Sequence, residues 1–135
     1  MVFIFSSGGS SGTLGRDDVF IEAFRETSRR IFCSSLGESA GEAVIFLLKE
    51  AMKSDPFVAL WENPKIFYNE MVKVFGEGAK ILINLLITTV NQECGLNMDP
   101  KHFLDLMCEG SQKSLNEIRS FIRRVAEIRG GGIKS

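Results

Sequence analysis

Two short stretches of the chain repeat each other: Leu36-Gly37-Glu38-Ser39-Ala40 and Phe75-Gly76-Glu77-Gly78-Ala79. Each is a large apolar residue, Gly-Glu, a small residue and Ala, and each opens an apolar run with helical spacing. Two copies of a helix-turn-helix unit would produce this pattern without a ligand. The repeat therefore predicts that Gly37 and Gly76 occupy equivalent positions and that the helices after them pack together.

The repeated residues suit helix junctions. Glycine tolerates a sharp change of chain direction at Gly37 and Gly76, and a glutamate is favourable at the positive end of the helix that follows. A ligand site that combines Glu38 and Glu77 is the alternative interpretation. Neither glutamate has His or Asp nearby in the sequence to make such a site specific. We therefore interpret the repeat as architecture.

Length and composition fit one folded domain. With 135 residues, 44% of them hydrophobic, the chain can bury a sizeable core without disulfides or metals. A formal net charge of −1 does not favour an electrostatic nucleic-acid binder. The most apolar window, 81–87, is much too short to span a membrane. The three cysteines have no CxxC spacing, which predicts reduced thiols in a cytoplasmic protein.

The chain divides into a terminal segment, a domain and a tail. Residues 1–15 contain a Gly/Ser-rich stretch and lack the cationic start and longer apolar core of a signal peptide. We expect a flexible segment, or one that packs on the domain or on a partner through Phe3 and Phe5. A phosphate-binding loop is the alternative, but the spacing of the known glycine motifs is missing. Residues 16–129 are predicted to form a single helical domain and residues 130–135 a flexible tail.

Helical periodicity predicts an all-α bundle of five or six helices. All three prolines follow an Asx residue, which predicts helix starts at Asp55-Pro56, Asn63-Pro64 and Asp99-Pro100. Ser35 and Glu38 have the spacing of a capping box. The predicted helices cover 17–33, a second helix that begins at the capping box and runs to 51, and then 64–75, 77–94 and 100–128. A short helical turn is expected at 56–61. A break near 110 that divides the last helix into two is the alternative.

The run Glu62-Asn63-Pro64-Lys65-Ile66-Phe67 is followed by Val74-Phe75-Gly76-Glu77-Gly78-Ala79 and an apolar helix. This pattern resembles one in small archaeal all-helical domains of unknown function. Some of these domains stand alone, and others are attached as proposed output modules of sensory proteins. The resemblance covers about residues 36–94. It implies a compact helical fold and a regulatory setting, and it carries over no catalytic residue.

The chemically reactive residues do not combine into a site. His102 is the single histidine and is expected to be exposed near a helix start. Cys94, His102 and Cys108 have the wrong spacing for a zinc site, and the apolar neighbours of His102 are expected to be core rather than a haem pocket. The glutamates lack the Glu-x-x-His pairs of a dimetal bundle. We therefore predict no catalytic residue, no metal and no cofactor, and we lean away from an enzyme.

Three kinds of function remain open. The first is a non-enzymatic interaction or regulatory module, expected to be homodimeric through the apolar 77–94 helix or the 104–125 stripe, with another protein as a further partner. The second is a small-molecule binder or sensor whose apolar pocket is lined by Trp61, Phe67, Met71 and Phe75. The third is nucleic-acid binding through Arg119, Arg123, Arg124 and Arg129. It is less favoured, because positive side chains near the C-terminal end of a helix are usually an ordinary solvated surface.

Overall fold

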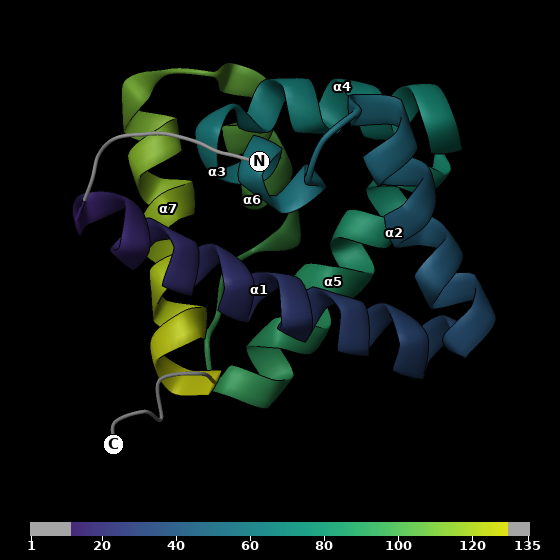
Figure 1. Cartoon of the computed structure of the whole chain (residues 1–135), viewed down its shortest axis with the longest axis horizontal. Coiled ribbons are helices and arrows are strands. Elements are labelled where there is room, and N and C mark those ends of the chain that lie inside the picture. The colour runs from purple at the N-terminus through teal and green to yellow at the C-terminus, as the bar shows by residue number, and fades with distance from the viewer. Residues whose placement is uncertain (1–11, 130–135) are drawn as a thin grey trace.

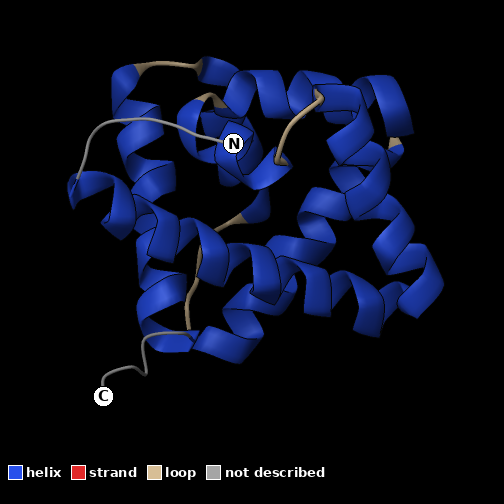
Figure 2. Ribbon diagram, in the orientation of Figure 1, coloured by secondary structure: helices blue, strands red, loops and turns tan. Residues whose placement is uncertain are grey.

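The computed structural model describes residues 12–129, with side chains from residue 17 onward (Figure 1). Within this range the chain forms helices joined by short loops and no strand (Figure 2). The helices are α1 (Gly12–Leu36), α2 (Glu38–Met52), α3 (Pro56–Glu62), α4 (Pro64–Phe75), α5 (Gly78–Cys94), α6 (Pro100–Glu109) and α7 (Gln112–Arg129). The predicted all-α class is confirmed. Predictions for residues 1–11 and 130–135 lie outside the described part of the chain.

Residues 12–129 contain seven helices rather than five or six, because two optional breaks both occur. Asp55 accepts a hydrogen bond from the Phe57 amide at 2.9 Å, and α3 begins there as a helix of its own. Gly110 ends α6 at φ 75°, and the Ser111 hydroxyl accepts a hydrogen bond from the Ser114 amide at 3.1 Å at the start of α7. The Asp55 cap thus makes α3 a separate helix, and the left-handed Gly110 divides the last predicted helix into α6 and α7, although helical periodicity continues across that break.

The three Asx-Pro starts are confirmed. Asn63 accepts a hydrogen bond from the Ile66 amide at 3.3 Å, and Asp99 accepts one from the Lys101 amide at 3.1 Å. The capping box predicted at Ser35 and Glu38 is wrong. Helix α1 continues through Leu36, and Gly37 precedes α2 without a side-chain cap. Glycine can adopt the φ of 100° found at position 37, so the chain turns there without a capping hydroxyl.

Helix α1 crosses one face of the molecule (Figure 1). It packs against α7 and α2, and it also contacts α3 and α5. Apolar side chains from all seven helices meet in a single core. The largest fully buried members of that core include Phe24, Ile31, Leu48, Leu60, Met71, Ile83, Ile87, Phe103, Met107, Ile118 and Ile122.

The two predicted dimer interfaces lie within this core. In α5 the buried residues are Ala79, Leu82, Ile83, Leu86, Ile87 and Val90. In the 104–125 stripe, Met107, Ile118, Ile122 and Val125 are fully or almost fully buried. Contacts inside the chain therefore already use both apolar surfaces. None of the helices within residues 12–129 combines the length and the apolar character needed to cross a membrane.

The helices after the two Gly-Glu motifs have different surroundings. Helix α2 packs on α1, α3 and α4, whereas α5 packs on α1, α4, α6 and α7. The pair α2 and α5 is not among the extensive helix contacts of residues 12–129. The glycines differ as well, since Gly37 lies at the start of α2 while Gly76 ends α4, with Glu77 between it and α5. The packing does not confirm the predicted duplication.

Candidate functional site

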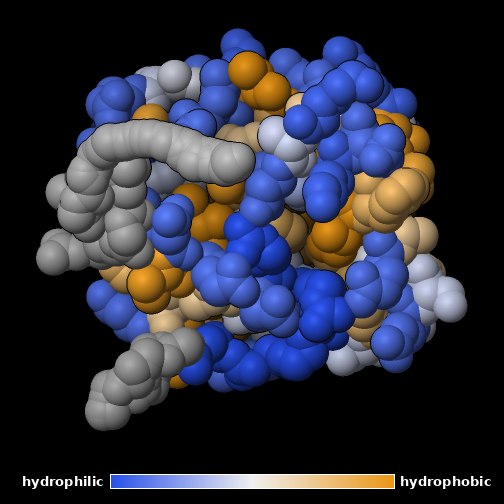
Figure 3. Space-filling view, in the orientation of Figure 1, coloured by the Kyte–Doolittle hydropathy of each residue, from blue (hydrophilic) through white to orange (hydrophobic). Residues whose placement is uncertain are grey.

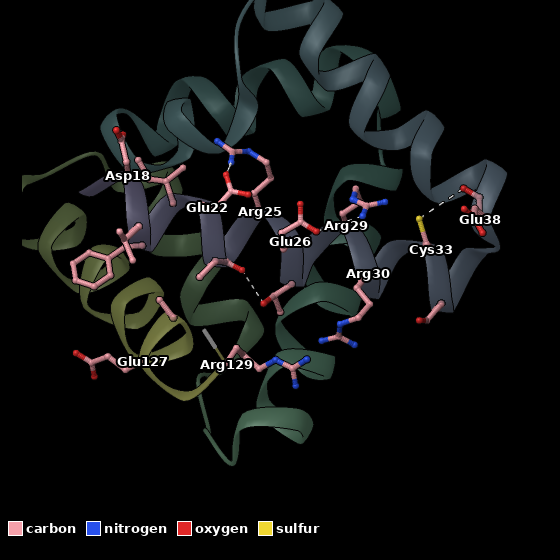
Figure 4. A pocket seen from close by; sticks show the side chains of 17 residues that line it. Asp18, Glu22, Arg25, Glu26, Arg29, Arg30, Cys33, Glu38, Glu127 and Arg129 are labelled. Carbon is pink, nitrogen blue, oxygen red and sulfur yellow. Dashed lines mark hydrogen bonds and ion pairs between the residues drawn. The ribbon is translucent and has the colours of Figure 1, made fainter. Parts of the chain in front are cut away.

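A groove of about 1170 Å³ follows the outward side of α1 (Figure 4). The long face of α1 supplies most of its lining, from Asp18 to Ser34. Glu38 at the start of α2 closes one end, and the last turns of α7 contribute Ala126, Glu127 and Arg129. The lining thus comes from α1 and from α2 and α7, the two helices on which α1 packs most extensively.

Apolar side chains form the floor near the N-terminal half of α1. Val19, Phe20, Ile21 and Ala23 lie there beside Ala126 of α7. Val19 remains 61% exposed, whereas Ile21 is buried and connects the floor to the core. Figure 3 shows apolar atoms between charged side chains on this face. A groove with an apolar floor and a polar rim is typical of sites that receive an apolar group.

The arginines along the rim are already paired. Arg25 contacts Glu22 and Asp55. Arg29 lies 2.6 Å from Glu42 and 3.3 Å from Glu26.

The third rim arginine connects three helices. Arg30 of α1 lies 2.7 Å from Glu93 of α5, and Arg129 of α7 lies 3.4 Å from the same carboxylate. The hydrogen bond from Arg30 lowers the pKa of Glu93 below its usual range, and the charges of Arg30 and Arg129 lower it further, although partial burial opposes them. The Glu93 carboxylate is therefore ionised well into the acidic range.

Three carboxylates of the lining have no such partner. Asp18, Glu38 and Glu127 form no ion pair within residues 17–129. Asp18 and Glu127 lie beside the apolar floor, and Glu38 lies at the other end of the groove. Because the rim arginines are neutralised by their own carboxylates, the charge that the groove offers to a ligand is negative.

Cys33 marks the end of the groove where α1 meets α2. Its Sγ lies 3.7 Å from the carbonyl oxygen of Glu38 and 3.9 Å from a carboxylate oxygen of Glu42. Burial raises the pKa of the Cys33 thiol, and the charge of Glu42 raises it further. A thiol with a raised pKa stays protonated at neutral pH, so Cys33 has the properties of a structural residue rather than a nucleophile.

The predicted ligand-lining residues lie in the core. Trp61, Phe67 and Met71 are buried, and Phe75 is half-buried against the same cluster. Trp61 has Phe20 beside it, with ring centroids 6.1 Å apart. The groove over α1 is lined by other residues, and so is a small cavity of about 150 Å³ between the start of α4 and the α6–α7 turn.

The arginines of α7 do not form one exposed row. Arg119 donates a hydrogen bond from Nε to the Trp61 carbonyl at 2.9 Å and stacks on the Trp61 ring at 5.2 Å. Arg123 lies 5.4 Å from the same ring and 5.9 Å from the ring of Phe20. Arg129 is paired with Glu93, and Arg124 is exposed. Three of the four residues predicted to contact nucleic acid are thus engaged with the protein itself.

His102 and the cysteines have different surroundings. His102 is exposed, as predicted, and lies 2.8 Å from Glu117 across the α6–α7 pair. Cys94 is half-buried, Cys108 is exposed, and all three cysteines are free. Within the described residues, no group of three or more His, Cys, Asp or Glu side chains is arranged to hold a metal ion.

No protein-family model, curated protein or solved structure matches this chain. Its function therefore has to be inferred from its own residues.

Sequence reasoning missed the groove. Periodicity identified the core-facing stripe of α1 but did not indicate that a second face is only partly covered. The signal in the sequence is Val19-Phe20-Ile21. Three consecutive apolar residues in a helix point in directions too far apart to lie in a single core-facing stripe, so one of them has to face outward.

Proposed function

We propose that this chain is a non-enzymatic interaction module that binds a segment of a partner protein in the groove over α1. The observation that carries the proposal is an apolar floor on which Val19 is exposed, beside a rim whose arginines are paired with carboxylates. The occupant is an apolar segment flanked by basic residues. Its apolar face would cover Val19 and Phe20, and its cations would lie near Asp18, Glu127 and Glu38.

The chemistry of the groove favours binding over catalysis. Arginines held by carboxylates keep their protons at any physiological pH, and the one thiol has a pKa above its usual value. Such groups suit orientation and charge matching more than proton transfer or nucleophilic attack. A regulatory setting is part of the proposal, and it is supported by the resemblance to archaeal domains attached to sensory proteins.

A peptide-binding experiment tests the proposal. The probe is a fluorescent helical peptide with a leucine face and lysine flanks, compared with the same peptide carrying glutamate flanks. We expect the lysine peptide to bind more tightly, and we expect Val19→Glu to weaken its binding at least about tenfold, because the apolar floor then carries a charge. Fluorescence anisotropy measures both effects.

The matched control is Ile81→Glu. Ile81 is an apolar residue of α5 that is 68% exposed and does not line the groove. This variant should bind the lysine peptide as the unmodified chain does. Equal binding of the two peptides, or equal loss in both variants, would contradict the proposal.

A further inference from the structure

A second apolar surface lies on α2, which supplies only Glu38 to the lining of the groove. The sequence Ala43-Val44-Ile45-Phe46-Leu47-Leu48 is apolar throughout, yet only Val44 and Leu48 of this run are buried. Phe46 is 59% exposed and Leu47 is 42% exposed. Ala40 and Ala43 are exposed as well. Helix α2 forms the right-hand edge of the molecule, where apolar atoms reach the surface (Figures 1 and 3).

Charged residues follow one side of this apolar surface in a definite order. Glu38 and Glu42 precede Phe46, whereas Lys49 and Lys53 come after it. Glu38, Glu42 and Lys49 lie along one flank of α2, and Lys53 is the C-cap residue just after the last turn, with a left-handed backbone at φ 58°. The midpoint between Glu42 and Lys49 falls between Ile45 and Phe46, and so does the midpoint between Glu38 and Lys53. The flank is therefore self-complementary in charge when α2 is reversed about that point.

We infer that α2 binds α2 of a second copy of this chain in an antiparallel pair whose twofold axis passes beside Phe46. In an isologous contact, residue i of one copy meets residue j of the other while residue j meets residue i, so only side chains beside the axis meet their own copies. Phe46 then packs against Phe46 of the second copy. Glu42 faces Lys49 of that copy, and Glu38 faces Lys53, with both contacts repeated by symmetry. A parallel pair would instead set the charged flank against the opposite flank of the second helix, so these four residues would not meet.

The charges that this pairing needs are available. Glu38, Lys49 and Lys53 form no ion pair within residues 17–129. Glu42 binds Arg29 through Oε2, which leaves its Oε1 for Lys49 of the second copy. Glu50 is exposed and lies beside Phe46 and Leu47, four and three residues after them, and the reversal places it level with Ala40 and Ala43 of the second copy.

The expected dimer is weak and reversible. One pair of helices of this length, 15 residues, buries less surface than the interfaces of permanent dimers. Sedimentation equilibrium of the full chain, from low micromolar to several hundred micromolar protein, should therefore show a monomer–dimer equilibrium. Phe46→Ser should raise the dissociation constant at least about tenfold, because the central apolar contact is lost. Ile81→Ser, which alters an exposed apolar residue of α5, should leave it unchanged.

A charge-swap pair tests the orientation and the register. Lys49→Glu and Glu42→Lys should each weaken self-association at least about tenfold, because each places like charges in contact. An equimolar mixture of the two variants should recover dimer formation, since every contact in the mixed dimer joins opposite charges. Circular dichroism of each variant confirms that it is folded. Because Glu42→Lys also removes the Arg29 contact, Lys49→Glu and Phe46→Ser supply the test if that variant unfolds.

Three results would overturn the inference. They are a chain that stays monomeric over the whole concentration range, a dimer that Phe46→Ser and Lys49→Glu leave intact, or a mixture of charge variants that associates no better than each variant alone. The dimer test is separate from the peptide test, because Val19 lies on α1 whereas Phe46 and Lys49 lie on α2. Val19→Glu should therefore weaken peptide binding and leave the monomer–dimer equilibrium unchanged.

Discussion

At the scale of single residues, Gly41 decides how closely α1 and α2 approach. A Cβ atom at this position would lie 2.5 Å from the Cys33 backbone nitrogen and 2.6 Å from its Cα. These are backbone atoms, so they cannot move aside as the end of a flexible side chain can. The absence of a side chain at position 41 therefore permits the contact that fixes the far end of the groove.

Gly41→Ala is expected to lower the free energy of unfolding by about 2 kcal/mol, because overpacking outweighs the better helix propensity of alanine. Urea denaturation followed by circular dichroism measures the change. The control is Gly78→Ala in α5, where a Cβ would meet only the Phe75 Cβ at an ordinary 3.6 Å. That variant should be as stable as the unmodified chain or more stable. A similar loss in both variants would show that crowding at Gly41 is not the cause.

Ser28 is a second residue with a measurable individual effect. Its side chain is completely buried, and its Oγ has no hydrogen-bond partner among residues 17–129. Ser28→Ala removes an unsatisfied hydroxyl and should raise the free energy of unfolding by about 1 kcal/mol. The matched control is Ser114→Ala, since the buried Ser114 hydroxyl bonds Ser111 and Glu109 and its loss should be destabilising. The same urea experiment serves, and a destabilised Ser28→Ala protein would contradict the expectation.

At the scale of helices, ion pairs along α1 connect it to the rest of the bundle. Arg25 binds Asp55 before α3, Arg29 binds Glu42 of α2, and Arg30 binds Glu93 of α5. Pairs this exposed contribute little stability individually. Their larger effect is to fix which groups along the groove carry unpaired charge.

Glu93→Gln tests the contact that joins α1, α5 and α7. The pKa of Glu93 is lowered in the folded chain, so its stabilising effect is complete above the unfolded pKa and is lost as the pH falls through the folded pKa. At pH 7 we expect the variant to be about 1 kcal/mol less stable than the unmodified chain. The difference should shrink as the pH falls through the lowered pKa of Glu93.

Urea denaturation at several pH values measures this difference. Glu127→Gln is the control, because Glu127 forms no ion pair within residues 17–129 and its replacement should change stability by less than about 0.5 kcal/mol. A Glu93→Gln deficit that is the same at neutral and acidic pH would mean that the ion pair is not its source.

At the scale of the whole molecule, the sequence predicts where helices begin and end better than it predicts which helices pack against each other. The Asx-Pro pairs and Gly95 mark helix ends through contacts within a few residues, so pattern alone finds them. Which helix covers which depends on packing across the whole chain, and no local signal reports it. That is why most of α5, although apolar nearly all round, belongs to the core, whereas Phe46 and Leu47 of α2 stay exposed.

The same limit explains the outcome for the candidate sites. Trp61, Phe67 and Met71 have the composition of an apolar pocket, but aromatic and methionine side chains at helical spacing equally suit a core, where they lie. The groove lies where the described residues leave Val19 exposed and Ala23 partly exposed, and such coverage is a property of the assembled bundle.

The central claim is that the groove over α1 receives an apolar segment with basic flanks. The most direct measurement is a nuclear magnetic resonance titration of the labelled chain with the lysine-flanked peptide. If the peptide binds in the groove, amide shift changes should be concentrated at residues 18–23 and 126–129. Shift changes confined to other helices, or none at saturating peptide, would contradict it.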